Sequence, residues 1–154
     1  MTDPSIEQVL EAHPLTRELR RDHARLLSAH AQNRVFAAGE YLWRQGEEGD
    51  ALLLIHSGEV DLEISVPNQG PLPVETIVAG EALGCSWMAP SERWQFDARA
   101  LTPVQAVVLQ GRHVREACDQ DVALGYELLK RLTPAIAQRL QRARLRLIEQ
   151  HLPR

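Results

Sequence analysis

The chain has 154 residues, a formal net charge of −4 and a sequence pI near 5.9, which predicts a single globular domain and disfavours a nucleic-acid binder. Its two cysteines, Cys85 and Cys118, form no C-x-x-C pair, which argues against a disulfide scaffold, a zinc site and a four-cysteine iron–sulfur cluster. No apolar run is long enough to span a membrane, and the first residues lack the basic and apolar regions of a signal peptide, so we expect no membrane association and a cytoplasmic location.

Residues 1–33 are predicted to form a helical leader. Ser5 can cap a first helix, and His13-Pro14 should end it. A second helical stretch places four leucines on or near one side: Leu15, Leu19, Leu26 and Leu27. We expect this leader to pack against the strands that follow it.

Residues 34–110 are predicted to form an antiparallel, jelly-roll-like β-roll of about eight short strands. Glycine recurs between short apolar or alternating segments, and glycine suits turns that require φ > 0. The turn glycines are Gly39, Gly46, Gly58, Gly80 and Gly84. The fold class is therefore mainly β with flanking helices.

Two neighbouring segments fix the expected core of the roll. Residues 51–55 are continuously apolar, as in a strand buried on both faces. Residues 59–66 alternate, so one set should face the core and the other the solvent. The inward set is Val60, Leu62, Ile64 and Val66, and the outward set is Glu59, Asp61, Glu63 and Ser65. We expect residues 51–56 to pair with residues 59–66 as strands through a turn at Ser57-Gly58.

Residues 111–154 are predicted to form C-terminal helices. A short helix over 112–118 follows Gly111, and the tail from Asp121 is helix-forming over roughly thirty residues. Pro134 must kink this tail or separate two helices. Beyond Pro134 an apolar stripe keeps a three-four spacing suited to another helix: Ile136, Leu140, Ala143 and Leu147. The stripe predicts packing on the roll or a homodimer through this helix.

The tail is also basic, with seven cations against two carboxylates from residue 127 onward. Such a run is a patch for a protein partner or a solvated helix face. If the apolar stripe pairs with the same stripe of a second copy, Arg139 is the arginine nearest the contact between the two helices. We expect it to meet an acidic face of the roll, such as Glu59 or Asp61.

Four motifs in order resemble the cyclic-nucleotide-binding domain family, the effector module of catabolite-activator-type regulators. The resemblance spans roughly residues 15–147. The motifs are Phe36-Ala37-Ala38-Gly39-Glu40-Tyr41-Leu42, Gln45-Gly46-Glu47, Leu53-Leu54-Ile55-His56-Ser57-Gly58-Glu59-Val60 and Gly80-Glu81-Ala82-Leu83-Gly84.

The resemblance implies a phosphate-binding cassette near residues 80–94, with a short helix starting near Glu81. Free N–H groups at such a helix start would face an anion. In the family, the carboxylate corresponding to Glu81 accepts a hydrogen bond from a ribose hydroxyl, and an arginine clamps the cyclic phosphate. The candidate ligand-binding residues are Gly80, Glu81, Ala82, Leu83, Gly84, Arg93 and Trp94.

The chain departs from the family pattern at the arginine. If Ala100 aligns with the alanine that ends the family's cassette motif, Trp94 occupies the position of the family arginine. Arg93 then lies one residue early, where strand alternation turns a side chain away from the pocket. Trp87 and Trp94 are core fillers or a platform for a different ligand. Cys85 is a small buried residue or a redox sensor. The departure predicts weak or altered binding of cyclic AMP or cyclic GMP, or another small ligand.

No catalytic motif is present: the chain has no G-x-S-x-G, P-loop, G-x-G-x-x-G or H-E-x-x-H. We therefore expect a non-enzymatic, ligand-sensing regulatory domain without a metal. The alternative is a degenerate member of the same fold that acts as an interaction or dimerisation module. DNA binding is not expected, because no helix-turn-helix follows the long helix.

Overall fold

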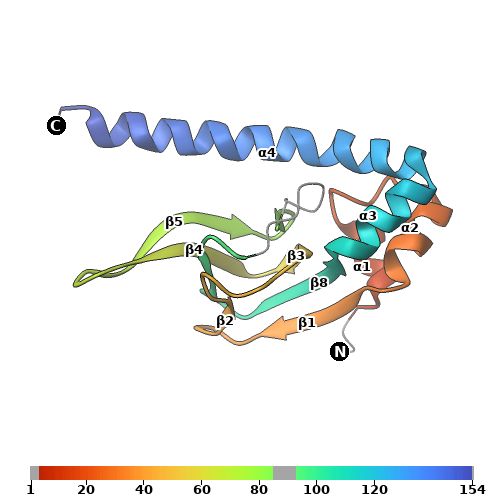
Figure 1. The fold of residues 1–154 in the computed structure, drawn as a ribbon, viewed down its shortest axis with the longest axis horizontal. Helices are drawn as coiled ribbons and strands as arrows, with labels where there is room; N and C mark the ends of the chain where they lie inside the picture. Colours follow the sequence, from red (N-terminus) through yellow and green to blue (C-terminus); the bar gives the residue numbers. More distant parts are fainter. Residues whose placement is uncertain (1–3, 85–92, 154) are drawn as a thin grey trace.

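The structure, a computed structural model, describes residues 4–84 and 93–153. The leader forms α1 (Ile6–Ala12) and α2 (Arg21–Ser28). Ser5 caps α1 in a capping box with Gln8, and α1 ends before His13, as predicted. Figure 1 shows α1, α2 and α3 (Gly111–Gln120) together at one end of the roll.

Two four-stranded antiparallel sheets form the roll, which confirms the predicted fold class. One sheet has the order β1 (Gln32–Phe36), β8 (Val104–Gln110), β3 (Ala51–Ser57) and β6 (Ala82–Leu83). The other has the order β2 (Tyr41–Trp43), β7 (Asp97–Ala100), β4 (Glu59–Val66) and β5 (Gly70–Val78). The sheets bury a core between their inner faces.

The predicted pairing of residues 51–56 with residues 59–66 is wrong. β3 pairs with β6 and β8, whereas β4 pairs with β5 and β7. Gly58 lies between the two strands with φ +93°, and a Cβ there would lie 2.2 Å from the Pro103 carbonyl oxygen. The chain therefore changes sheets at this corner instead of folding back as a hairpin.

The predicted alternation of β4 holds at Val60 and Leu62, which are buried, but not at Ile64, which is only partly buried. Pairing between β4 and β7 ends at Glu63, so the rest of β4 has only β5 beside it. Asp61 and Glu63 were expected in solvent and are buried instead. Arg99 makes a two-pronged ion pair with Glu63, at 3.0 and 2.8 Å, which satisfies the buried carboxylate.

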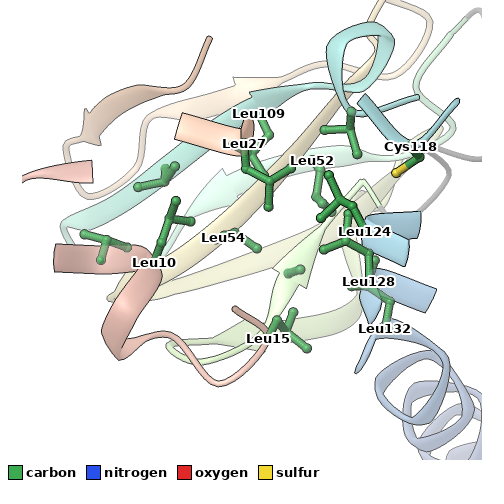
Figure 2. Close-up of a cluster of buried hydrophobic side chains, with 14 residues drawn as sticks. Leu10, Leu15, Leu27, Leu52, Leu54, Leu109, Cys118, Leu124, Leu128 and Leu132 are labelled. Atoms are coloured by element: carbon green, nitrogen blue, oxygen red, sulfur yellow. The ribbon is translucent and has the colours of Figure 1, made fainter. Parts of the chain in front are cut away.

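β3 is buried on both faces, as predicted. Leu53 and Ile55 contribute to the core between the sheets. Leu52 and Leu54 contribute to a second core beneath the helices, which Figure 2 shows together with Leu124, Leu128 and Leu132. This second core fixes the helices to one sheet of the roll.

The tail forms one helix, α4 (Val122–His151), with Asp121 as its N-cap. Pro134 lies inside α4 and does not divide it into two helices. Its side chain is exposed, so the carbonyl left without a helical partner is on the solvent side. Figure 1 shows α4 running lengthwise past β5. Within the described residues, no helix combines the length and apolar character needed to cross a membrane.

Candidate functional site

The glycine-rich motif at residues 80–84 forms the turn from β5 into β6. Gly80 and Gly84 have φ values of +92° and +77°. A Cβ at Gly84 would lie 2.0 Å from the Ala51 carbonyl oxygen, so this close approach requires glycine. The expected helix start at Glu81 is wrong for the residues described there. Ala82 and Leu83 form β6 and pair with Leu54 and Leu53 instead.

The Glu81 carboxylate is engaged by α4. Arg142 Nη2 donates to Glu81 Oε2 at 2.9 Å, and this ion pair raises the pKa of Arg142, chiefly through the hydrogen bond. The Glu81 backbone carbonyl lies 3.2 Å from His13 Nε2. A ribose hydroxyl would therefore have to compete with a guanidinium for this carboxylate.

Trp94, which the sequence comparison with the family predicted to replace its arginine, stacks on Trp43 with ring centroids 3.9 Å apart and planes 10° from parallel. The indole lies against Gly49, where a Cβ would come within 1.8 Å of Trp94 Nε1. Two backbone hydrogen bonds hold Trp94 in place, one from its own N–H to the Glu47 carbonyl and one from the Gly46 N–H. These contacts hold the Trp94 indole in one position against Trp43 and Gly49.

Arg93 is exposed, and its Nη1 donates to the Gly46 carbonyl at 2.6 Å. Strand alternation was expected to turn Arg93 away from the pocket. Arg93 instead forms an isolated bridge with Glu48, ahead of β7, and both Arg93 and Trp94 line the same cavity. The rule that successive side chains of a strand point to opposite faces does not apply to Arg93 and Trp94, because these two residues belong to no regular strand.

This cavity, about 540 Å³ in volume, lies between the roll and α4. Four of the predicted ligand residues line it: Leu83, Gly84, Arg93 and Trp94. Three stripe residues line it from the helix: Ile136, Leu140 and Ala143. Among the predicted residues Gly80, Glu81, Ala82 and Leu147 are not part of its lining, and Cys85 and Trp87 lie outside the described residues.

Sequence reasoning missed several lining residues, chiefly Glu75 and Arg139. Arg139 makes a two-pronged ion pair with Glu75, at 2.8 and 3.0 Å, and also donates to the Ala82 carbonyl at 3.1 Å. Arg139 does meet an acidic residue of the roll, as expected, but this residue is Glu75 of β5 and neither Glu59 nor Asp61. The two partners are 64 residues apart, and no local spacing could have paired them.

Arg139, Arg142 and Arg146 together form what we call the arginine clamp. Arg146 donates to the Val74 carbonyl of β5, Arg139 and Arg142 both reach Glu75, and Arg142 reaches Glu81. β5 and β6 are edge strands of the two different sheets. The clamp therefore ties α4 to the open edges of both sheets, next to the cavity.

Two further features of the described residues involve titratable groups, the Cys118 thiol and a cluster of two aspartates and a histidine. Burial raises the pKa of the Cys118 thiol to about 11, so this cysteine is not a reactive thiolate at neutral pH. Asp22, His23 and Asp121 lie within 4.8 Å of one another, as metal ligands do. However, the Arg20 hydrogen bond lowers the pKa of Asp22 to about 2, and Asp121 caps α4.

Comparison with known proteins gives the same fold. A putative cyclic nucleotide-binding protein from Geobacter metallireducens is similar at 24% identity and TM-score 0.75, over 90% of this chain and 99% of that one. A cyclic nucleotide-binding domain from Methylobacillus flagellatus is similar at 23% identity and TM-score 0.78, over 97% and 84% of the two chains. The sensor domain of the transcriptional regulator DNR from Pseudomonas aeruginosa is similar at 21% identity and TM-score 0.70, over 88% and 91%.

No curated protein sequence matches the chain. The family model described as cyclic nucleotide-binding domain matches residues 33–121, which is more than half of the sequence. Apart from Gln32 at the start of β1, this range includes both sheets of the roll and the motif at residues 80–84. The chain therefore belongs to the cyclic nucleotide-binding domain family.

Proposed function

We propose that this chain is a non-enzymatic, cytoplasmic ligand-sensing domain that binds cyclic AMP and cyclic GMP weakly or not at all. The observation that carries the proposal is the Trp94 indole, stacked on Trp43 where the family places its phosphate-binding arginine. The engagement of Glu81 by Arg142 adds to it. Both changes remove charge-assisted contacts to the nucleotide, each typically worth a few kcal/mol.

The sensing step is a population shift of α4. The second half of α4 borders the cavity and is held to the roll by the arginine clamp. A ligand that contacts α4 in only one of its positions favours that position by its difference in binding free energy. The readout is then the surface that α4 presents to a partner.

We infer that this partner is a second copy of the chain. The predicted stripe extends toward the start of α4 in unbroken four-three spacing, which is the pattern of a coiled-coil seam. The seam residues are Val122, Tyr126, Leu129, Thr133, Ile136, Leu140, Ala143 and Leu147. All of them are exposed. The charge of Arg139 and Arg142 is partly neutralised by Glu75 and Glu81 of the same chain, which lowers the repulsion between paired helices.

Isothermal titration with cyclic AMP and cyclic GMP tests the ligand part of the proposal. Loss of a phosphate contact costs roughly a hundredfold in affinity, so we expect weak or undetectable heat. Submicromolar binding of either nucleotide would overturn it. In that case Arg93 is the remaining clamp, and Arg93→Ala should abolish the binding.

Light scattering at moderate salt tests the homodimer. We expect a dimer for the natural sequence and a monomer for Leu140→Glu, which places a charge in the seam. Leu145→Glu is the matched control, because Leu145 is exposed to a similar extent (48% against 51%) on another face of α4. A natural chain that stays monomeric at high concentration would contradict the proposal.

The alternative function is an interaction or dimerisation module without a small ligand. The seam supports dimerisation whether or not the cavity is occupied. This alternative predicts that α4 pairs equally well in the presence and absence of every small molecule tested.

A further inference from the structure

The cavity beside α4 has an aromatic wall formed by the roll. Trp43, Trp94 and Phe96 all line it, and the two indoles are held parallel. Trp43 Nε1 donates to the Phe96 carbonyl at 3.0 Å, which fixes the orientation of the Trp43 indole. A wall of this kind is pre-organised, so an aromatic ligand that packs against it loses little side-chain entropy of the protein.

The opposite wall is aliphatic and belongs to α4. It consists of Ile136, Leu140 and Ala143, one above the other on the helix. A volume of about 540 Å³ lies within the range of pockets that bind small organic molecules. The space therefore suits a compact, mostly apolar body between an aromatic and an aliphatic surface.

The charges in the lining are engaged within the protein, which favours an uncharged occupant: Arg93 is exposed and donates to the Gly46 carbonyl, and the other two charged side chains form an ion pair. Glu75 and Arg139 neutralise each other in a two-pronged pair, and Arg139 also donates to the Ala82 carbonyl. An anionic ligand would have to displace Glu75 from Arg139 and leave a partly buried carboxylate without its partner. A charged group placed against this pair would therefore lose its hydration without gaining an equivalent contact.

We propose that this cavity binds an uncharged, flat aromatic molecule packed between the Trp43–Trp94–Phe96 wall and α4. The inference rests on the proposed ligand-sensing function and names the class of ligand. Such a molecule contacts Ile136 and Leu140 directly, so its binding changes the position or exposure of the coiled-coil seam.

Fluorescence titration of the full chain with the uncharged probe N-phenylnaphthylamine tests the proposal. We expect saturable binding of one probe per chain, with energy transfer from tryptophan. Trp94→Ala should weaken binding at least about tenfold, whereas Trp94→Phe, which keeps a ring in the wall, should retain most of it. Thermal unfolding of both variants checks that the roll stays folded.

Two matched pairs sharpen the test. Ala143→Trp fills the cavity and should abolish binding, whereas Ala137→Trp, at an exposed position outside the cavity lining on the same helix, should not. The anionic analogue anilinonaphthalene sulfonate shares the aromatic body and should bind at least about tenfold more weakly than the uncharged probe. Equal affinity of the two probes, or probe binding that Trp94→Ala leaves unchanged, would overturn the inference.

A failure of the proposed ligand class can be distinguished from a failure of the proposed function. If no uncharged aromatic probe binds while cyclic nucleotides bind weakly and the chain is a dimer, only the ligand class is wrong, and the interaction module stands. If cyclic AMP binds tightly, the proposed divergence from the family is itself wrong.

Discussion

The two halves of α4 are attached to the roll by different kinds of contact. In the first half, Leu124, Leu128 and Leu132 are buried in the core beneath the helices (Figure 2). In the second half, beyond Pro134, the large apolar side chains are exposed and the arginine clamp makes the contacts. Apolar burial is worth more than partly exposed ion pairs, so we infer that the first half is an anchor and the second half can change position.

The largest expected effect tests the anchor. Leu128→Ala removes a buried side chain and should lower the free energy of unfolding by about 2–5 kcal/mol. Leu145→Ala, at an exposed position in the second half, should change it by less than about 0.5 kcal/mol. Urea denaturation of the two variants measures both. Similar losses would mean that the two halves are equally packed.

The arginine clamp should contribute less than the anchor. Arg139→Gln leaves the Glu75 carboxylate, which is only 23% exposed, without its two-pronged partner. We expect a loss of about 1–3 kcal/mol and faster amide hydrogen exchange over residues 136–147 than over residues 124–132. Arg144→Gln removes the same charge from an exposed position of α4 and is the control. Uniform exchange along α4 would contradict the division into two halves.

His13 joins the leader to β3 and to the turn at Glu81, and its burial should make the stability of the fold sensitive to pH. Its Nε2 lies 3.1 Å from the Ile55 carbonyl and 3.2 Å from that of Glu81, and its Nδ1 accepts from the Leu15 N–H. Burial is the main reason that the pKa of His13 is lowered from 6.5, against the opposing effect of the two carbonyls. The folded state therefore holds the neutral ring.

The direction in which pH changes the stability follows from proton binding to His13. Below pH 6.5 the unfolded chain binds a proton that the folded chain does not, so stability should fall as pH falls through this window. The loss amounts to about 1.4 kcal/mol for each unit by which the pKa is lowered. Urea denaturation at about pH 7.5 and 5.5 measures it, and the slope should flatten in His13→Gln. An unchanged slope in the variant would assign the pH dependence to other groups. The Arg20 hydrogen bond lowers the pKa of Asp22 from 3.8 to about 2, so its stabilising contribution is lost only below about pH 4 and should not interfere.

The smallest effect is expected at the exposed end of the clamp. Arg142 is 49% exposed in its pair with Glu81, and such pairs contribute about 0.2–1 kcal/mol and are screened by salt. Arg142→Gln should lower the unfolding temperature slightly at low salt and not at high salt. Thermal unfolding at the two salt concentrations measures this, and a loss that persists at high salt would show that Arg142 acts through packing.

Local patterns in the sequence determined much of the fold. The capping residue Ser5, the doubly buried strand at residues 51–55 and the helices after Gly111 follow from nearest neighbours along the chain, because capping and periodicity act over a few residues. Family-like motifs gave the roll and four of the residues that line the cavity: Leu83, Gly84, Arg93 and Trp94.

Tertiary structure alone decided how these pieces meet. The change of sheet at Gly58, the burial of Glu63 against Arg99 and the Glu75–Arg139 pair all join segments far apart in the sequence. Glu81 illustrates the same limit at the site: its contact with a ligand stays a prediction, and no sequence pattern indicated that its carboxylate pairs with Arg142, 61 residues away. Charged and polar groups find partners according to three-dimensional proximity, because burial penalises any group left unpaired, and sequence spacing carries no record of that proximity.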